Sequence, residues 1–358
     1  MQHAKLSASG SGQWFNCPGS IAAQQGIPNE SSPYAQEGTI AHELAEMCLR
    51  ENIDTDTAIG EFTDDMRQHV QTYIDYVRAY LPNSEHRFLV ESRVDFSRWV
   101  PKGFGTLDAA VIDYNANTVD CFDLKYGKGV QVSPYKNSQQ LLYCLGLVNK
   151  IKRDLSGYTF RLHIHMPRKF TSDPYELDYA ELMAFGEFAA QKAKEALAPD
   201  APRIPGESQC RFCRAKADCP DLYEHTQKII GDSFDELDSE GITDEQKRLI
   251  LDNQSLITDF MQTIREQVQN TLMDGGEFPG YKLVAGRSNR RWLPQATEIL
   301  ESELGDMAFT RKLIGLGAAE KLYGDISDLT EKPEGLPTLV PETDRREKYT
   351  KNMFTNVK

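Results

Sequence analysis

Apolar residues recur with two different periods along the chain, and the change of period separates predicted helices from predicted strands. Helical spacing covers residues 34–50 and 64–80, where apolar side chains repeat every three or four positions. Alternation of apolar with other residues covers 107–113 and 118–124, two segments joined by the turn-forming sequence YNAN. This part of the chain is therefore expected to form two helices and, further on, a β-hairpin.

Four more segments extend this pattern. A strand is predicted at RFLVESRVDF, and the other three are a helix over 135–148, a strand over 158–166 and an alanine-rich helix over 179–197. Helices, strands, a helix and a strand in this order are typical of an α/β fold. We predict a central mixed β-sheet flanked by helices.

The C-terminal part of the chain differs from what precedes it. Residues 222–274 are acidic and keep a helical period, and residues 295–316 are predicted to form a further amphipathic helix. We therefore predict a first domain of residues 1–225 and a largely helical C-terminal region of residues 226–358. That region is a candidate for DNA contact or for oligomerisation.

Composition and charge narrow the class of protein. The 358 residues are 40% hydrophobic and 26% charged, with a formal net charge of −14, which is ordinary for a globular protein. No apolar run approaches a membrane span, and the N-terminal sequence lacks a signal-peptide core, so we expect a cytoplasmic protein without membrane contact. The acidic balance argues against indiscriminate nucleic-acid binding but is compatible with metal-binding carboxylates beside a local basic groove.

Three charged residues occupy hairpin positions where apolar strand residues are expected. Asp108 lies near the start of the first strand, and Asp123 and Lys125 lie at the end of the second. Residues two apart on a strand point to the same face, so Asp123 and Lys125 project together and can meet Asp108 across the hairpin. Two carboxylates beside a lysine are suited to hold Mg²⁺ next to a polarised phosphate. A surface salt bridge on a sheet edge is the alternative interpretation.

Clustered cysteines form the second signal. Cys210, Cys213 and Cys219 have the spacing C-x2-C-x5-C, and a proline follows the last of them. In a reducing cytoplasm such thiols indicate a metal rather than disulfides. Three thiolates leave a tetrahedral zinc or a four-iron cluster one ligand short, and Cys17 is the candidate fourth ligand. The other cysteines lie in periodic apolar segments and are expected in the core: Cys48, Cys121 and Cys144.

An ordered set of motifs resembles the RecB-like branch of the PD-(D/E)XK nuclease superfamily. The motifs are GxxxH ending at His42, a strand carboxylate at Glu91, G-x-x-D ending at Asp108, D-x-K from Asp123 to Lys125, and QxxxY from Gln139 to Tyr143. Glutamine and tyrosine four residues apart share one helix face. The resemblance implies a restriction-endonuclease-like core and metal-dependent hydrolysis of phosphodiester bonds in DNA.

The resemblance also assigns a role to each matched residue. It implies that Mg²⁺ or Mn²⁺ is held by His42, Asp108 and Asp123, with Glu91 acting as a ligand or indirectly. Lys125 would orient or activate the attacking water and offset charge in the transition state. The last pair, Gln139 and Tyr143, would position the scissile strand or the lysine.

The cysteine arrangement resembles a second known feature. One N-terminal cysteine with a C-terminal triplet ending in Cys-Pro is similar to the iron–sulfur staple of AddB-type and CRISPR-adaptation nucleases. There a 4Fe-4S cluster ties the two ends of the nuclease domain together. The resemblance therefore favours a 4Fe-4S cluster over a structural Zn²⁺ at Cys17, Cys210, Cys213 and Cys219, although spacing alone does not separate the two.

Longer segments resemble a family of phage and prophage RecB-like nucleases: NCPGS, EGTxAHELAE, DLKYGKG and GYKLVxGRSxRxW. This resemblance implies an exonuclease in a bacterial host cell. Such an enzyme would resect linear duplex ends for a phage single-strand annealing or binding protein. The sequence leaves open exonucleolytic or endonucleolytic cleavage, polarity, strand preference and oligomeric state, a homo-oligomer included.

Basic residues supply candidate DNA contacts outside these motifs. Lys128 follows the D-x-K motif in a glycine-containing loop that either approaches a phosphodiester or simply connects two elements. Further candidates for gripping a DNA backbone or stacking a base are Lys282, Arg287, Arg290, Arg291 and Trp292. A solvated strand and turn is the alternative interpretation of this second group.

Two other classes of protein fit part of the pattern. A non-catalytic DNA-binding or adaptor protein with a structural zinc or iron–sulfur staple would keep the cysteines, but it has no need of Asp108, Asp123 and Lys125 together. An iron–sulfur redox enzyme needs an open cluster position, whereas four available cysteines close the cluster.

Overall fold

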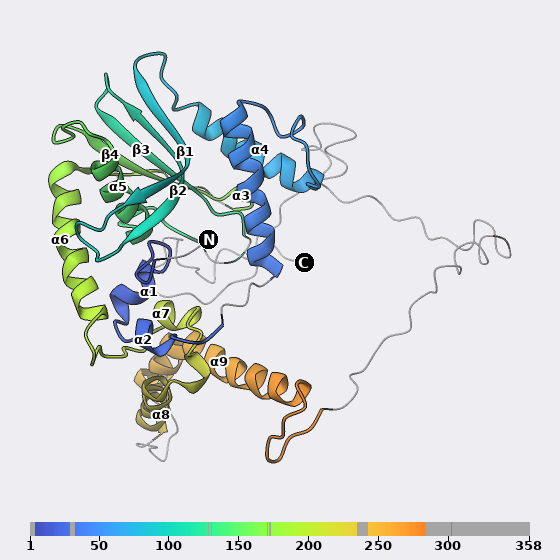
Figure 1. Cartoon of the computed structure of the whole chain (residues 1–358). Coiled ribbons are helices and arrows are strands. Elements are labelled where there is room, and N and C mark those ends of the chain that lie inside the picture. Colours follow the sequence, from blue (N-terminus) through green and yellow to red (C-terminus); the bar gives the residue numbers. More distant parts are fainter. Residues whose placement is uncertain are drawn as a thin grey trace, which may run out of the picture. The chain divides into compact units, whose positions relative to one another are not determined.

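A five-stranded β-sheet is the centre of the molecule in this computed structural model, which describes residues 4–28, 33–127, 129, 131–169, 171, 173–234, 243–283 and 302 (Figure 1). The strands are β1 (His86–Asp95), β2 (Phe104–Asp113), β3 (Thr118–Leu124), β4 (Thr159–His165) and β5 (Tyr175–Asp178). The chain divides into two units, Met1–Leu283 and Val284–Lys358, and only Ser302 of the second unit is described. Every element named below belongs to the first unit.

The strands follow their sequence order across the sheet, and the sheet is mixed. Pairing is antiparallel between β1 and β2, between β2 and β3, and between β4 and β5. β3 and β4 pair in parallel, and α5 (Ser138–Lys150) lies between them in sequence. Parallel neighbours require such a crossover because the end of the first strand and the start of the second lie at opposite ends of the strands. The predicted mixed α/β fold is confirmed.

Helices cover both faces of the sheet (Figure 1). Alternate residues of β2 enter two different cores, because side chains on a strand point in turn to opposite faces. Ala109 and Val111 pack with one pair of helices, and Ala110 and Ile112 pack with the other pair. The first pair is α3 (Pro33–Glu51) and α4 (Asp64–Arg78), and the second is α5 and α6 (Tyr179–Ala196).

The predicted bounds of these elements differ from the observed ones by three residues at most. The hairpin strand at 118–124 is as predicted, whereas β2 begins at Phe104 and α5 begins at Ser138. The start of α5 has a local cause, since the Asn137 side chain accepts the backbone N–H of Gln140 at 3.2 Å and caps the helix.

The N-terminal segment packs against a segment almost two hundred residues later. The Gly19 N–H donates to the Pro202 carbonyl at 2.8 Å, and the Gln13 amide donates to the Gln209 carbonyl at 2.9 Å. The elements brought together are α1 (Ser11–Asn16), α2 (Ser20–Ala23), α7 (Glu207–Arg211) and a short 3₁₀ helix (Lys216–Asp218).

Two helices extend the chain beyond this segment, α8 (Pro220–Phe234) and α9 (Asp244–Met273). Leu256 and Phe260 of α9 pack against Leu222 and Cys210 in a small core of their own. The predicted helical C-terminal region is confirmed over these helices, while 295–316 lies outside the described residues. The domain boundary after residue 225 stays a prediction. Among the described helices, none is long and apolar enough to cross a membrane.

Candidate active site and cysteine cluster

Three carboxylates lie in register across neighbouring strands. Val90 pairs with Ala109 and Ser92 with Leu107, so Glu91 stands opposite Asp108. The ladder between β2 and β3 ends with Ala109 opposite Phe122, which places Asp108 opposite Asp123 one step further on. The sheet therefore aligns Glu91, Asp108 and Asp123 in one row.

The backbone departs from regular strand geometry at this row. Glu91 has φ of 40°, and the ladder skips the pair formed by Glu91 and Asp108. On β2, regular alternation would place the Leu107 side chain on the face opposite to Ala110 and Ile112. Leu107 instead packs in the same core as these two residues, so the alternation of the strand is interrupted at the row. At this interruption of the ladder, the Asp108 carboxylate accepts the backbone N–H of Leu124 at 2.7 Å.

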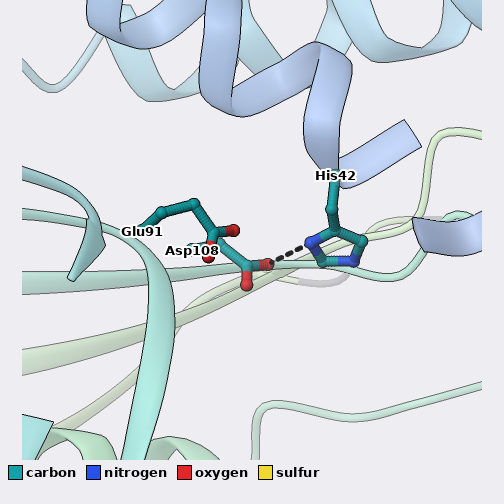
Figure 2. Close-up of side chains that lie close together, drawn as sticks. All are labelled: His42, Glu91 and Asp108. Carbon is teal, nitrogen blue, oxygen red and sulfur yellow. Dashed lines mark ion pairs between the residues drawn. The ribbon is translucent and has the colours of Figure 1, made fainter. Parts of the chain in front are cut away.

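His42 completes a compact group of ligands. It comes from α3, and its Nδ1 lies 3.4 Å from Asp108 Oδ2. One atom each from His42, Glu91 and Asp108 lie within 4.8 Å of one another, and the three side chains point toward a common centre (Figure 2). One imidazole and two carboxylates are a donor set suited to Mn²⁺ or Mg²⁺.

The charges in this group perturb one another. Burial and the neighbouring Asp108 carboxylate raise the pKa of Glu91 to about 7. Burial disfavours the His42 imidazolium, but the charge of Asp108 and its contact with the ring outweigh burial and raise the pKa of His42 to about 9. Burial also opposes the charge of Asp108, whose pKa nevertheless stays below its ordinary value because His42 and Lys125 stabilise the carboxylate. The group thus holds excess negative charge that a cation would stabilise.

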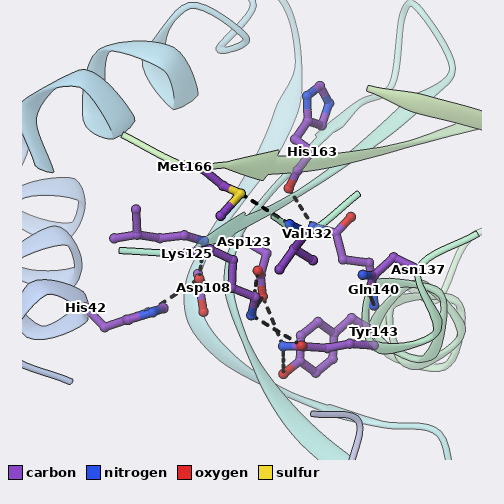
Figure 3. A network of polar contacts seen from close by, with 12 residues as sticks. His42, Asp108, Asp123, Lys125, Val132, Asn137, Gln140, Tyr143, His163 and Met166 are labelled. Carbon is purple, nitrogen blue, oxygen red and sulfur yellow. Dashed lines mark hydrogen bonds and ion pairs between the residues drawn. The ribbon is translucent and has the colours of Figure 1, made fainter. Parts of the chain in front are cut away.

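Lys125 lies on the other side of Asp108. Its Nζ is 2.7 Å from Asp123 Oδ2 and donates to Gln139 Oε1 at 3.3 Å (Figure 3). The Asp123 side chain is only 2% exposed, whereas that of Lys125 is 30% exposed, so solvent reaches the lysine but not the aspartate. Burial alone would lower the pKa of Lys125, but the charges of Asp123 and Asp108 raise it. Lys125 therefore acts as a fixed cation here rather than as a base.

Helix α5 supplies the support for this lysine. Gln139 Nε2 donates to Asp123 Oδ1 at 3.0 Å and to the Tyr143 hydroxyl at 3.2 Å, which confirms that glutamine and tyrosine share one helix face. The Tyr143 ring packs on Gly105, where an added Cβ would come within 2.7 Å of the ring. The glycine of the G-x-x-D motif is thus needed for close approach of the helix.

The strained backbone at Glu91 gives a test of the site's geometry. Both Glu91→Ala and Glu91→Gly remove the carboxylate, but only glycine adopts a positive φ without steric cost. We expect the glycine variant to be more stable than the alanine variant by about 1 kcal/mol. Urea unfolding of the two full-length variants without divalent cations measures the difference. Equal stabilities, or a more stable alanine variant, would contradict the strain.

The structure brings the four predicted cysteine ligands together. Cys17, Cys210, Cys213 and Cys219 line one cavity that also includes Ile204, Pro205 and Leu222. The Cys17 sulfur accepts the Ile204 N–H at 3.3 Å, and the Cys210 sulfur accepts the Gly206 N–H at 3.4 Å. Backbone N–H groups aimed at sulfur stabilise metal-bound thiolates. These thiols therefore fit a metal site, and Cys48, Cys121 and Cys144 are buried in the two main cores, as predicted.

The spacing of the thiols bears on the kind of metal. Among the described histidine, cysteine, aspartate and glutamate residues, one group of three has ligand atoms that all lie within 4.8 Å of one another. That group is His42, Glu91 and Asp108. No three of the four thiols are therefore that close. A tetrahedral zinc with Zn–S bonds of about 2.3 Å requires sulfur atoms about 3.8 Å apart. The four thiols could hold either a zinc ion or an iron–sulfur cluster.

The candidate DNA contacts receive less support. Lys282 is exposed in the segment after α9, well separated in sequence from the carboxylate row. The others lie outside the described residues: Lys128, Arg287, Arg290, Arg291 and Trp292.

One supporting residue was not anticipated from the sequence. Arg168 donates to the Tyr126 hydroxyl at 2.6 Å, to Glu37 at 2.9 Å and to Asp65 at 2.6 Å. It thereby joins the first turns of α3 and α4 to the residue that follows Lys125. No sequence signal marks it, because its partners are separated from it by 42 to 131 positions.

The fold and these two sites define a mixed α/β protein with a histidine–carboxylate–lysine site in its sheet and a cysteine cluster joining the ends of its core. The chain belongs to the family DUF2800, described as a protein of unknown function, whose model matches residues 3–347. The match includes the sheet, both sites and most of the C-terminal region. Because the family carries no assigned activity, the function has to be argued from the sites.

Proposed function

We propose that this protein is a Mg²⁺- or Mn²⁺-dependent deoxyribonuclease of the RecB-like branch of the PD-(D/E)XK superfamily. The observation that carries the proposal is the row of Glu91, Asp108 and Asp123 across three strands, with His42 on one side and Lys125 on the other. The motif resemblance names these same five residues, and their gathering at one place in the sheet supports the proposal. A surface salt bridge would not need three aligned carboxylates or a break in the ladder.

The residues divide into two working groups. His42, Glu91 and Asp108 would hold the metal ion, and Asp123, opposite Asp108 on the next strand, would add a further oxygen ligand although it lies outside their compact group. When bound, the ion supplies Lewis-acid activation of the phosphate and lowers the pKa of an attacking water. Asp108 is fixed by the Leu124 N–H, so the ligand geometry is set before any metal binds.

Lys125 supplies positive charge to the reacting phosphate. Its side chain is partly exposed and its ammonium group keeps its proton, so it could donate a hydrogen bond to a phosphate oxygen as negative charge grows there. Gln139 holds this ammonium group and Asp123 at once and is itself backed by Tyr143. We assign Gln139 and Tyr143 as positioning residues.

The biological setting follows from the resemblance to phage and prophage nucleases. We propose an exonuclease that resects linear duplex ends and passes the product to a single-strand annealing or binding protein. The cysteine cluster would carry a 4Fe-4S group that ties the N-terminal segment to the segment around α7, and the resemblance to iron–sulfur nucleases is what favours it over zinc.

A non-catalytic DNA-binding or adaptor protein is the second candidate. It would explain the cysteine cluster, because a staple stabilises a binding module as well as an enzyme. It leaves unexplained the raised pKa of Glu91 and the strained backbone beneath it, since perturbed carboxylates and strain gather at catalytic sites.

One preparation tests both parts of the proposal. Anaerobically purified full-length protein should be brown, contain about four irons per chain and degrade end-labelled linear duplex in Mg²⁺ or Mn²⁺ while sparing closed circles. A colourless zinc protein that cleaves DNA would correct the staple alone. Protein that contains its metal but cleaves no form of DNA would remove the catalytic proposal and leave the binding module.

A further inference from the structure

Three positively charged side chains lie together at the outer edge of the sheet, on the strand that carries Glu91 and at the end of α5. β1 is an edge strand, and its last residues form one wall of an open cavity of about 640 Å³. The lining residues come from β1, the loop after it and the end of α5: Arg93, Asp95, Ser97, Arg98, Asn149 and Lys150. We call it the β1-edge cavity.

The cations of this cavity form no ion pair within 4.0 Å among the described residues, although the charge of Arg93 acts on Asp95. Arg93 lies over the Phe104 ring at 3.8 Å, Arg98 lies 5.1 Å from the Trp99 ring, and Lys150 Nζ donates to the Arg93 carbonyl at 2.9 Å. The one acid in the lining, Asp95, accepts the Ser97 N–H at 2.7 Å, and this contact lowers its pKa. Three cations against one anion leave the cavity positive on a chain whose net charge is −14.

The cavity is built rather than assembled from loose surface side chains. Lys150 and Asn149 both bind the edge of β1, because Asn149 donates to the Asp95 carbonyl at 2.8 Å. These contacts fix the end of α5 against the strand and block the edge from pairing with another strand. The aromatic rings beneath Arg93 and Arg98 hold the two guanidinium groups at the surface.

The cavity also lies on the same strand as the proposed site. Arg93 follows Glu91 by two residues, a distance of about 7 Å along a strand. A duplex advances by about 3.4 Å for each nucleotide of a strand. A DNA strand whose scissile phosphate lies at the carboxylate row and which runs along β1 would therefore place phosphates a few nucleotides away at these cations.

We propose that the β1-edge cavity binds the phosphodiester backbone of the DNA substrate beside the cleavage site. The inference rests on the proposed nuclease function and adds to it a binding surface for the DNA backbone at the β1-edge cavity, which we call the substrate track. Guanidinium groups suit this task because their planar fork matches two phosphate oxygens. Backbone contacts of this kind position the substrate without selecting its sequence.

The test is DNA binding by the full-length Arg93→Gln/Arg98→Gln variant. Binding of a fluorescein-labelled duplex is followed by anisotropy over a range of salt concentrations, without added divalent cations so that no cleavage interferes. We expect the dissociation constant at low salt to rise about tenfold and the slope of log K against log[salt] to become shallower by about 2. With Mg²⁺ present, KM for cleavage should rise while kcat stays close to that of the native protein.

A matched variant controls for charge. Lys194→Gln/Lys228→Gln removes two positive charges from α6 and α8, far from β1 in the fold, and should change binding less than twofold. Arg98 lies outside β1, so Arg98→Gln alone does not alter the strand. It should give about half the change in the slope of log K against log[salt], which tests the proposal even if substitution of Arg93 disturbs folding.

The outcomes separate the two proposals. A protein that cleaves DNA but binds it equally well with and without Arg93 and Arg98 overturns the track and leaves the nuclease. Binding that depends on these arginines without any cleavage keeps the track and removes the nuclease. A protein that neither binds nor cleaves DNA overturns both.

Discussion

Lys125→Ala should lower the rate of DNA cleavage by about a thousandfold, which is the loss typical for removal of one charge-stabilising donor from an active site. Its ammonium group lies 2.7 Å from Asp123 Oδ2, beside the proposed metal ligands (Figure 3). The bound metal ion would remain, so residual cleavage is expected to exceed that of the protein without metal. Single-turnover cleavage of an end-labelled duplex in Mg²⁺ measures the effect on the chemical step.

Folding has to be separated from chemistry in this experiment. Without Lys125, Asp123 remains buried and loses its cation, and an unpaired buried charge destabilises a protein. Asp108→Asn is therefore the second variant, since its amide oxygen can still accept the Leu124 N–H while the metal ligand is lost. Lys152→Ala, an exposed lysine beyond α5, controls for charge. If Lys125→Ala and Asp108→Asn both melt like the native protein and cleave DNA at its rate, the assignment of the active site to these residues is wrong, whereas full-length native protein that cleaves no DNA would overturn the nuclease proposal itself.

Four of the five strands could be predicted because each leaves a local period in the sequence. The four-residue strand β5 was not predicted, since it is too short to show one. The hairpin of β2 and β3 follows from alternation on both sides of a turn, and this symmetry also places Asp108 opposite Asp123. Gln139 and Tyr143 could be paired because helical spacing is local. Cys17 was matched to its partners by counting the ligands that a metal needs, not by any period.

Other parts of the site depend on contacts that no local pattern records. The positive φ of Glu91 occurs at a residue type that seldom adopts it, so alternation predicts an ordinary strand residue there. Arg168 and its acidic partners meet only after α3, α4 and the end of β4 have packed. The β1-edge cavity joins Arg93 to Lys150, which are separated by 57 positions. Such features follow from tertiary packing, which sequence periods do not encode.

Cys17→Ser should remove the metal from the cysteine cluster and lower the free energy of unfolding by about 3 kcal/mol or more, because metal binding at such sites is coupled to folding. Among the described residues, Cys17 is the one thiol that the N-terminal segment contributes to the cavity, so its loss would remove the metal-mediated link from that segment to α7 and the 3₁₀ helix. Iron analysis and thermal unfolding of the full-length variant measure both effects. Cys48→Ala removes a buried thiol from another core and should keep the iron, at a cost of about 1 kcal/mol.

The same substitution should also slow DNA cleavage, although Cys17 belongs to a different site. The N-terminal segment reaches the active site through the Ser11 hydroxyl, which lies 2.7 Å from that of Ser138, the first residue of α5. Gln139 follows directly and holds Lys125, so a displaced α1 would loosen the lysine. We therefore expect Ser11→Ala to reduce cleavage partly while retaining the iron, whereas Cys17→Ser loses both. A Cys17→Ser protein with native iron content and native stability would show that Cys17 is not a ligand.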